Sequence, residues 1–598
     1  MLHSVIREIF RFTRRKPPSP PVHGAVAATQ YRLDAITDAL KANAPDRALD
    51  EAKRALVEQP LDPRFWYYAG LAEYLLGNVH AAAESLRQAL ERDARNFDSH
   101  LLLGAIRQEQ SMLSEALDQY RRAAAIRPTD APVHGYMGNM LFMLGRYGDA
   151  VSCYEKSLQL DPENAVMQSN LLFAMNNAPH LNRSLVFEAH LRWGQRLEKK
   201  WAHARKAHAN ERSPDRPLRI GYVSADFRSH SVAYFIDPFW SKIDRAHYKT
   251  YVYDNFPGAP DEVARRLQRL ADAWRRIADL SDDDVARLVR EDGIDVLVDV
   301  SGHTGGNRLA VFARKPAPVQ ATWFAYMNTT GLQAIDYRIT DEYLSPSGSS
   351  EAYYTEALFR IPSCACFSPA PESPPVNALP ALKNGFITFA SFNSWAKVSP
   401  QVIDAWCRIL TALPRARLLL VARGGDDTQA RARMLDPFAR NGIDRERVSV
   451  LGTRPLAEFL NMFQDVDIAL DPFPYNGGTT SLHTLWMGVP VVTLQGNSET
   501  ARGGGSILCG MGLKDLVAGN VDEYCAIAAG LARDTGRLGQ LRLTLREKMA
   551  QSPIMDAGPT TRAMEMAFRE MWRNYVRGDR ASLSVPPAQR PLQKETSS

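Results

Sequence analysis

The chain has 598 residues, which at about 150 residues per domain predicts about four structural units. Hydrophobic residues make up 45% of the sequence and charged residues 23%, so a mainly disordered protein is excluded. A net charge of +5 over this length is too small to indicate a dedicated nucleic-acid binder. The six cysteines are scattered and predict neither a disulfide scaffold nor a zinc site. We therefore expect a cytoplasmic protein without a bound metal.

The two ends of the chain are predicted to lie outside the folded domains. Residues 1–28 form a basic tail whose apolar run is broken by Arg7 and Arg11, which is unlike a signal peptide. A solvated tail is favoured there over a weak amphipathic surface helix. Residues 579–598 are rich in Pro, Ser and charge, and we expect them to be disordered. No window of about 18 uncharged apolar residues predicts a membrane span.

An internal repeat of 34 residues occupies the first part of the chain. The repeated positions are Gly70, Gly104 and Gly138; Ala48, Ala82, Ala116 and Ala150; and Pro128 and Pro162. This period, with small residues at two places and Pro after the second helix, is typical of tetratricopeptide repeats. Two antiparallel helices approach closely only where small residues leave room, and Pro ends the second helix. The spacing predicts repeats at 29–62, 63–96, 97–130 and 131–164, followed by a capping segment up to 182.

Beyond residue 218, short apolar segments alternate with helical ones. The predicted strands are LRIGYVSADF, YKTYVYDN, IDVLVDVS and PVQATWFAY in a first group, and FITFASFN, ARLLLVAR, RVSVLG, VDIALD and PVVTLQG in a second. Helices are predicted between them, at 261–280 and 282–293, and at 399–414 with Ser399 as its cap. Such alternation predicts two parallel, doubly wound sheets with ligands bound at the carboxyl ends of their strands.

These patterns predict an α-solenoid followed by two Rossmann-like lobes. The expected boundaries are a tail at 1–28, repeats and cap at 29–182, a linking helix at 183–216, a first lobe at 217–373, a second lobe at 374–578 and a tail at 579–598. The Pro-rich stretch 368–385 is the expected joint between the lobes.

The segment 471–492, DPFPYNGGTTSLHTLWMGVPVV, is the most informative for chemistry. A strand is expected to end at Asp471, and Gly477 and Gly478 precede a helix that begins at Thr479 and Thr480. The first N–H groups of a helix lack partners and favour an anion, so a phosphate site is favoured over an ordinary capped helix. His483, one turn into the helix, is a candidate to reach a ribose, although a histidine at such a position is more often packed.

Other candidate residues follow predicted strands. Lys397 lies after FITFASFN, where its charge would neutralise a diphosphate, although a lone loop lysine is usually a solvated charge. His230 and His303 follow strands of the first lobe, and either could act as a base or a hydrogen-bond donor. For each histidine alone a structural role is slightly favoured. The Asp465-Val466-Asp467 pair resembles a metal motif, but its place before a buried strand favours a structural role.

Several segments resemble the tetratricopeptide-containing protein O-linked N-acetylglucosamine transferases, including bacterial and plant Spindly-type members. They are LRIGYVSADFRSHSV, DGIDVLVDVSGHTGGNRL, RKPAPVQATWFAYMNTTGLQAIDYRITDEYLSP, ITFASFNSWAKVSP and DIALDPFPYNGGTTSLHTLWMGVPVVTL. The resemblance, which spans about residues 29–575, implies two Rossmann-like lobes of the GT-B type, a UDP-sugar donor, inversion at the anomeric carbon and no required metal.

The resemblance also implies roles for particular residues. His230 falls on the family's active-site histidine, Lys397 on its diphosphate-binding lysine, and Thr479 and Thr480 on its phosphate-binding threonines. The expected donor-binding set is Asn393, Lys397, Asn476, Gly477, Gly478, Thr479, Thr480 and His483, with His303 as a sugar or acceptor contact. The animal enzymes have a histidine where this chain has Gly478, and an acidic residue where it has His483.

The implied activity is transfer of N-acetylglucosamine from UDP-N-acetylglucosamine to Ser or Thr of proteins, with the solenoid presenting the acceptor. The expected partners are a nucleotide sugar, as co-substrate rather than cofactor, and protein or peptide acceptors, without nucleic acid or an integral membrane segment. Two alternatives remain open: transfer of fucose or glucose by the same fold, or a peptide-binding scaffold without activity.

Overall fold

The computed structural model describes residues 25–179 and 181–579. The predicted tails at 1–24 and 580–598 lie outside the described residues. The chain forms two compact units. One contains the repeats up to residue 167 together with segments 422–436 and 450–452, and the other contains the rest.

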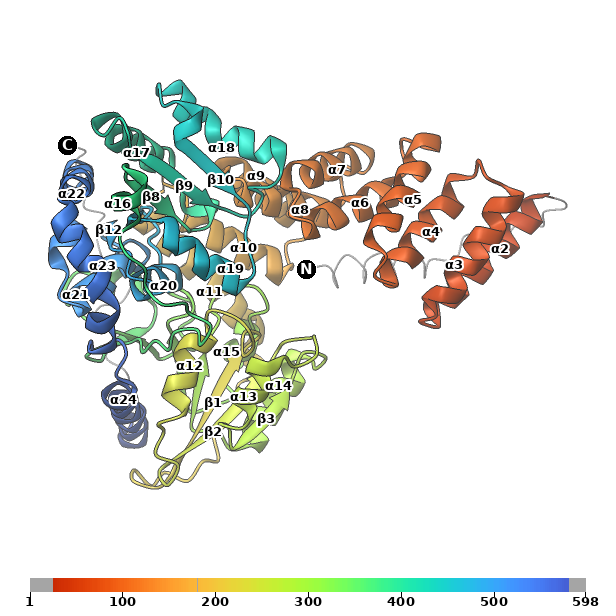
Figure 1. Cartoon of the computed structure of the whole chain (residues 1–598). Coiled ribbons are helices and arrows are strands. Elements are labelled where there is room, and N and C mark those ends of the chain that lie inside the picture. The colour runs from red at the N-terminus through yellow and green to blue at the C-terminus, as the bar shows by residue number, and fades with distance from the viewer. Residues whose placement is uncertain (1–24, 180, 580–598) are drawn as a thin grey trace. The chain divides into compact units, whose positions relative to one another are not determined.

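The repeats form four pairs of antiparallel helices, which Figure 1 shows from red to orange. The helices are α2 (Ala25–Lys41), α3 (Pro45–Glu58), α4 (Pro63–Leu75), α5 (Val79–Arg92), α6 (Phe97–Glu109), α7 (Leu113–Ile126), α8 (Ala131–Met143) and α9 (Tyr147–Leu160). The repeated glycines permit the close packing that the sequence predicted: a Cβ on Gly104 would lie 2.7 Å from the ring of Tyr120, and one on Gly138 would lie 2.7 Å from the ring of Tyr154. The α-solenoid is confirmed.

Two further helices follow the repeats. Helix α10 (Ala165–Met175) lies in the segment predicted as a cap, and α11 (Arg183–Trp201) begins at the predicted start of the linking helix. Asn182 caps α11, because its side chain accepts the N–H of Leu185 at 2.9 Å. After Trp201 a single 3-10 turn, η1 (Ala202–Ala204), is followed by irregular chain up to the first strand.

The first lobe is built on a seven-stranded parallel sheet of order β3-β2-β1-β4-β5-β6-β7. Its strands are β1 (Leu218–Ser224), β2 (Tyr248–Asp254), β3 (Ala273–Arg276), β4 (Val296–Asp299), β5 (Val319–Trp323), β6 (Tyr337–Thr340) and β7 (Ala357–Arg360). Its helices are α12 (Ala233–Trp240), α13 (Glu262–Gln268), α14 (Asp282–Glu291) and α15 (Leu309–Ala313). The alternation thus produces the predicted Rossmann-like lobe.

The helix predicted over 261–280 is wrong in its second half. Helix α13 ends at Gln268, and Ala273–Arg276 forms the edge strand β3, paired in parallel with β2. The segment is rich in helix-forming residues, but pairing with β2 overrides this weak local preference. Strands β6, β7 and β13 were also not predicted.

The second lobe contains a six-stranded sheet of order β10-β9-β8-β11-β12-β13. Its strands are β8 (Thr388–Ser391), β9 (Arg417–Val421), β10 (Val448–Leu451), β11 (Ile468–Leu470), β12 (Val491–Leu494) and β13 (Val517–Ala518). Its helices are α16 (Pro380–Asn384), α17 (Pro400–Ala412), α18 (Thr428–Arg440), α19 (Leu456–Met462), α20 (Thr479–Trp486) and α21 (Gly503–Gly510). Ser399 caps α17 as predicted, since its hydroxyl accepts the N–H of Val402.

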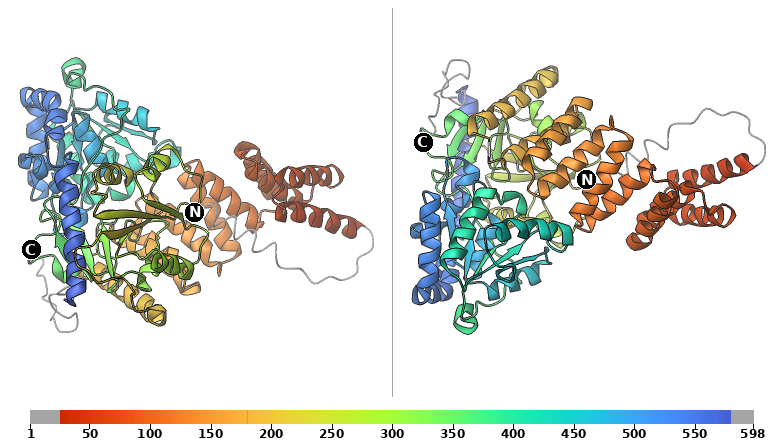
Figure 2. Two further views of the ribbon diagram at one scale, coloured as in Figure 1. Left: turned by 90° about the horizontal axis from the view of Figure 1, so that it is seen from below. Right: turned by 90° about the horizontal axis from the view of Figure 1, so that it is seen from above.

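The last three helices are α22 (Val521–Arg533), α23 (Thr535–Ala550) and α24 (Ala557–Arg577), drawn in blue along the side of the lobes in Figure 2. Helix α24 lies in the segment predicted as second lobe, but its buried residues Met564, Phe568 and Trp572 belong to the core of the first lobe, with Tyr222 and Trp323. The C-terminal helix therefore ties the two lobes together.

Candidate active site

The loop after β11 is held by the carboxylate of Asp471. The N–H of Gly477 donates to Asp471 Oδ1 at 2.7 Å, and the hydroxyl of Thr493 donates to Asp471 Oδ2 at 2.7 Å. Space at Gly477 is tight, because a Cβ there would lie 2.2 Å from Ser481 Oγ and 3.0 Å from Asn393 Oδ1. A larger residue at position 477 would therefore displace the side chains of Ser481 and Asn393.

Helix α20 begins where the sequence predicts it, at Thr479. Its N-cap is Gly478, which provides no capping side chain. Within the described part of the chain, the N–H groups of Thr479 and Thr480 have no hydrogen-bond acceptor. Both threonines are only partly buried. Free N–H groups and the positive end of the helix dipole favour an anion at this position.

Lys397 lies beside the same loop, in the 3-10 turn η3 (Trp395–Lys397). Its ammonium donates to the carbonyl oxygen of Asn476 at 2.8 Å and lies 4.2 Å from the centroid of the Tyr475 ring. Burial lowers the pKa of Lys397 to about 8, although the nearby carboxyl of Asp471 acts to raise it. Burial likewise raises the pKa of Asp471 to about 6. The two groups are both desolvated by burial, and their opposite charges attract each other.

Asn476 links this loop to the segment after β12. Its side-chain amide donates to the carbonyl of Pro472 at 3.0 Å, and its backbone N–H donates to the carbonyl of Thr500 at 2.8 Å. The structure therefore brings most of the predicted donor-binding residues together: Asn393, Lys397, Asn476, Gly477, Gly478, Thr479 and Thr480.

His483 lies on the same helix, but it is almost fully buried, with 4% of its surface exposed. Its ring contacts the edges of Tyr234, from α12, at 4.8 Å and of Phe367 at 5.3 Å between centroids. Its Nδ1 has no hydrogen-bond partner among the described residues, and burial lowers its pKa to about 4. The imidazole is therefore neutral and packs where the first lobe meets the second.

His230 lies in the loop between β1 and α12, four residues before Tyr234. Its side chain is 38% exposed, with Nδ1 3.7 Å from Asp226 Oδ1 and accepting the N–H of Val232 at 3.4 Å. Partial burial lowers the pKa of His230, while the carboxylate of Asp226 opposes this shift. The ring is thus both neutral near pH 7 and accessible, as either proposed role requires.

His303 lies in a different environment from the open loop position that the sequence suggested. It is 1% exposed, its Nδ1 lies 3.1 Å from Ser169 Oγ, and its Nε2 lies 2.9 Å from the carbonyl oxygen of Thr330. The rings of Trp193 and His190 pack on it. Both ring nitrogens are occupied within the fold, so this geometry favours the structural role.

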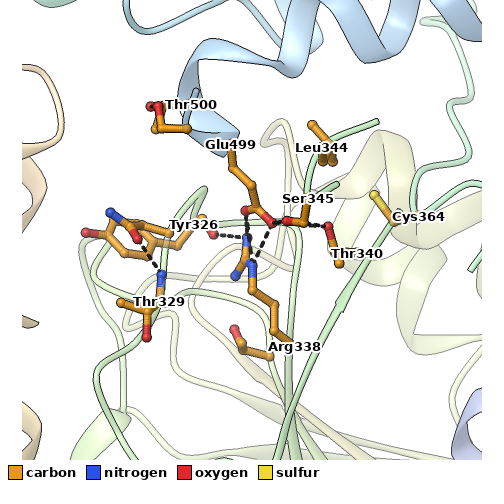
Figure 3. A network of polar contacts seen from close by, with 12 residues as sticks. Tyr326, Thr329, Arg338, Thr340, Leu344, Ser345, Cys364, Glu499 and Thr500 are labelled. Atoms are coloured by element: carbon orange, nitrogen blue, oxygen red, sulfur yellow. Dashed lines mark hydrogen bonds and ion pairs between the residues drawn. The ribbon is translucent and has the colours of Figure 1, made fainter. Parts of the chain in front are cut away.

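A buried ion pair between the lobes was not predicted (Figure 3). Arg338 on β6 binds the carboxylate of Glu499, which lies in the 3-10 turn η6 (Glu499–Ala501) of the second lobe. The hydroxyls of Ser345 and Thr340 donate to Glu499 Oε1 at 2.5 and 3.1 Å, and Arg338 also donates to the carbonyl of Tyr326. The two side chains are 2% and 1% exposed. No local sequence signal reveals a pair separated by 161 positions.

Asp467 of the Asp-x-Asp pair has the structural role predicted from its position. Its carboxylate accepts the N–H groups of Ala381 and Thr388 at 2.9 and 2.8 Å. Among the described residues no group of three or more His, Cys, Asp or Glu side chains is arranged to hold a metal ion. None of the helices in the described ranges is long and apolar enough to cross a membrane.

The chain matches known families over most of its length. The family described as glycosyl transferase family 41 matches residues 196–367 and 377–564. Tetratricopeptide repeat families match residues 33–84, 76–131 and 131–164.

Individual proteins are similar as well. A probable UDP-N-acetylglucosamine–peptide N-acetylglucosaminyltransferase SPINDLY from Oryza sativa subsp. japonica is 40% identical over 438 residues, which is 72% of this chain and 47% of that protein. A UDP-N-acetylglucosamine–peptide N-acetylglucosaminyltransferase from Caenorhabditis elegans is 24% identical over 480 residues, 60% of this chain and 41% of the relative. The chain thus spans about half the length of the curated relatives it matches. A solved mutant of the Thermobaculum terrenum O-GlcNAc transferase superposes with a TM-score of 0.79 at 36% identity, covering 86% of this chain and 98% of that one.

Proposed function

Because this chain belongs to glycosyl transferase family 41, we propose that it moves a sugar from a nucleoside diphosphate onto a hydroxyl group of a protein side chain. The observation that carries the proposal is the assembly of Lys397 with the open N-terminus of α20. A positive side chain and free N–H groups at one place suit a diphosphate leaving group.

The proposed reaction is a direct displacement. The acceptor oxygen forms a bond to the anomeric carbon while the bond from that carbon to the diphosphate oxygen breaks, which inverts the anomeric configuration. The charge that develops on the departing diphosphate is stabilised by Lys397 and by the N–H groups of Thr479 and Thr480. The hydroxyl proton leaves to solvent or to His230, whose ring is neutral and accessible.

N-acetylglucosamine from UDP-N-acetylglucosamine, transferred to Ser or Thr, is the first choice of donor and acceptor. Proteins that carry this activity in their names are among the similar ones, both at 40% and at 24% identity. Transfer of fucose or glucose by the same fold remains an alternative. A thermal-shift screen of nucleotide sugars identifies base and sugar together, because a bound ligand raises the unfolding temperature.

The donor site is proposed to need no divalent ion, because protein groups supply the positive charge. Treatment with EDTA should leave both UDP binding and transfer unchanged. Loss of activity in EDTA that Mg²⁺ or Mn²⁺ alone restores would contradict this part of the proposal.

Replacement of the lysine tests the function directly. Lys397→Ala should lower the rate of transfer by about 10²–10³, because loss of one group that stabilises developing charge has this effect. The matched control is Lys383→Ala, which removes an exposed lysine from α16 in the same lobe.

Transfer is measured by mass spectrometry of acceptor proteins and donor hydrolysis by release of the nucleotide. Near-normal turnover in a folded Lys397→Ala protein would exclude the proposed role. Absence of both reactions in the wild-type protein, for every donor that binds, would favour the non-catalytic scaffold instead.

A further inference from the structure

A pocket of about 540 Å³ lies within the larger unit, in the size range of ligand sites. Its walls come from the turn between α10 and α11, from the loop after β5 and from residues 496–502 after β12. Two arginines, Arg183 and Arg502, line it, and none of its described lining residues is Asp or Glu. The pocket is therefore positively charged.

Arg183 presents a free hydrogen-bonding edge. Its Nη1 donates to the carbonyl of Asn497 at 2.8 Å, and the guanidinium lies 4.1 Å from the centroid of the Tyr353 ring. Its Nε and Nη2 have no acceptor, and no carboxylate pairs with Arg183, in the part of the chain that the structure describes. The guanidinium is half-buried and stacks on an aromatic ring, and the N–H groups of its Nε and Nη2 remain available. Such an arrangement is suited to binding a carboxylate or phosphate.

Arg502 adds a second positive charge that is also without an acidic partner among the described residues. Its Nε donates to the carbonyl of Tyr343 at 2.6 Å, and its Nη1 donates to the carbonyl of Gly496 at 3.2 Å. Burial lowers the pKa of Arg502, and the positive charge of Arg183 lowers it further. The carboxylate of Asp341 opposes this shift without cancelling it. An anion bound between the two arginines would relieve their remaining repulsion.

The pocket adjoins the donor loop. Pro474 and Thr500 both line it, and the carbonyl of Thr500 holds the N–H of Asn476, whose own carbonyl accepts the ammonium of Lys397. The remaining polar lining is uncharged, with Asn176 and Asn328 among its side chains. These two amides are already bonded, since Asn328 Nδ2 donates to Asn176 Oδ1 and Asn176 Nδ2 donates to the hydroxyl of Tyr326, both at 2.7 Å. The two arginines therefore remain the groups that suit a ligand, and they fit one acidic group on a peptide.

We propose that this pocket binds a carboxylate of the acceptor polypeptide through Arg183 and Arg502, so that the protein selects acceptors with an acidic residue near the modified hydroxyl. This inference rests on the proposed function. This carboxylate is distinct from the diphosphate of the donor, which is proposed to bind to Lys397 and the N-terminus of α20.

The test uses the full chain and labelled short peptides with one central Ser or Thr. A single Glu is moved through the flanking positions, and a matched set carries Gln. Binding is measured by fluorescence anisotropy in the presence of UDP, and transfer is measured separately by mass spectrometry. We expect the best Glu peptide to bind about tenfold more tightly than its Gln counterpart, since hydrogen bonds to charged groups are strong.

Arg183→Gln should abolish this preference while leaving affinity for the Gln peptide and for UDP unchanged. Arg183→Lys should retain part of it, because the charge remains but the fork is lost. The control is Arg192→Gln on the same helix, where the side chain is 65% exposed and paired with Glu188. This control should behave as wild type.

No preference for Glu in the wild type, an unchanged preference in Arg183→Gln, or no peptide binding at all overturns the inference. A peptide with phosphoserine in place of Glu should also bind. Binding of the phosphopeptide with no preference for Glu would overturn the carboxylate inference and assign the pocket to a phosphate group. A fall in UDP affinity in Arg183→Gln would assign the pocket to the donor. Selective binding without transfer would refute the proposed function, and with it the acceptor role of the peptide, while leaving the carboxylate site at Arg183 and Arg502. Transfer without selectivity would refute the inference and leave the proposed function.

Discussion

His230 can either accept the proton of the attacking hydroxyl or orient the donor sugar by a hydrogen bond. A base must be neutral to act, so in that role His230→Ala should lower kcat and remove the acidic limb of the pH–rate profile. A positioning group should instead raise KM for the donor and leave the shape of the profile unchanged. We expect positioning, because a displacement with a good leaving group needs little help from a base until late.

Steady-state kinetics of His230→Ala as a function of pH distinguish these roles. Unchanged donor affinity with a lost acidic limb would assign the base to His230. Because partial burial lowers the pKa of His230, that limb should lie at lower pH than for an exposed histidine. Unchanged kinetics would make His230 a structural residue. His303 could not readily take its place, since both its ring nitrogens are hydrogen-bonded in the core.

Lys397 should set an alkaline limit on activity. Only the protonated amine stabilises a diphosphate, and burial lowers the pKa of Lys397 to about 8. As pH rises through this value, the free enzyme loses its positive charge, so kcat/KM for the donor should fall. Lys397→Arg keeps the charge at all accessible pH values. Its residual activity should therefore lack the alkaline limb, and a limb that persists near pH 8 in this variant would belong to another group.

At the scale of elements, the buried ion pair between Arg338 on β6 and Glu499 in η6 joins the two lobes. Replacing only Arg338 by Met leaves the charge of Glu499 buried without its partner, and replacing only Glu499 by Leu does the same to Arg338. Loss of one partner of a buried pair costs about 3–5 kcal/mol. The double variant Arg338→Met, Glu499→Leu should cost less than the sum of the single changes, because neither charge is left alone. The temperature of unfolding, measured by calorimetry, tests this expectation. Strictly additive shifts would show that the pair contributes no coupling between the lobes.

The short helix α20 shows how an element creates a site. Gly478 caps it without a side chain, so the N–H groups of its first turn stay available for a ligand. The helix packs against the first lobe through His483, whose ring contacts that of Tyr234. The N-terminus of α20 is therefore open to a ligand, while the helix packs against the first lobe.

At the scale of the whole molecule, the repeats are proposed to select acceptor proteins. Deletion of residues 29–164 should therefore reduce protein glycosylation much more than donor hydrolysis. The deletion also removes Ser114, whose N–H donates to Asp427 Oδ2 at 2.9 Å, so Asp427→Asn in the full chain is the control for this lost contact. Equal loss of both activities would mean that the repeats mainly support the transferase fold.

The sequence by itself determined the elements whose causes are local. The period of 34 residues follows from packing between neighbouring helices, so Gly104 and Gly138 revealed the solenoid before any contact was known. The cap at Ser399 and the helix start at Thr479 depend on a few adjacent residues and were predicted at the correct positions. The family resemblance supplied the predicted donor-binding residues. In the structure Lys397 lies against the loop before α20 that contains Gly477.

Only the tertiary structure decided features that join distant segments. The strand at Ala273–Arg276 forms because β2 is available as a partner, although its local sequence favours a helix. The burial of His303, the return of α24 to the first lobe and the pair of Arg338 with Glu499 all depend on contacts that no local pattern encodes. The positive charge of the pocket at Arg183 also depends on tertiary contacts. An arginine without an acidic partner can be recognised only when its neighbours in space are known.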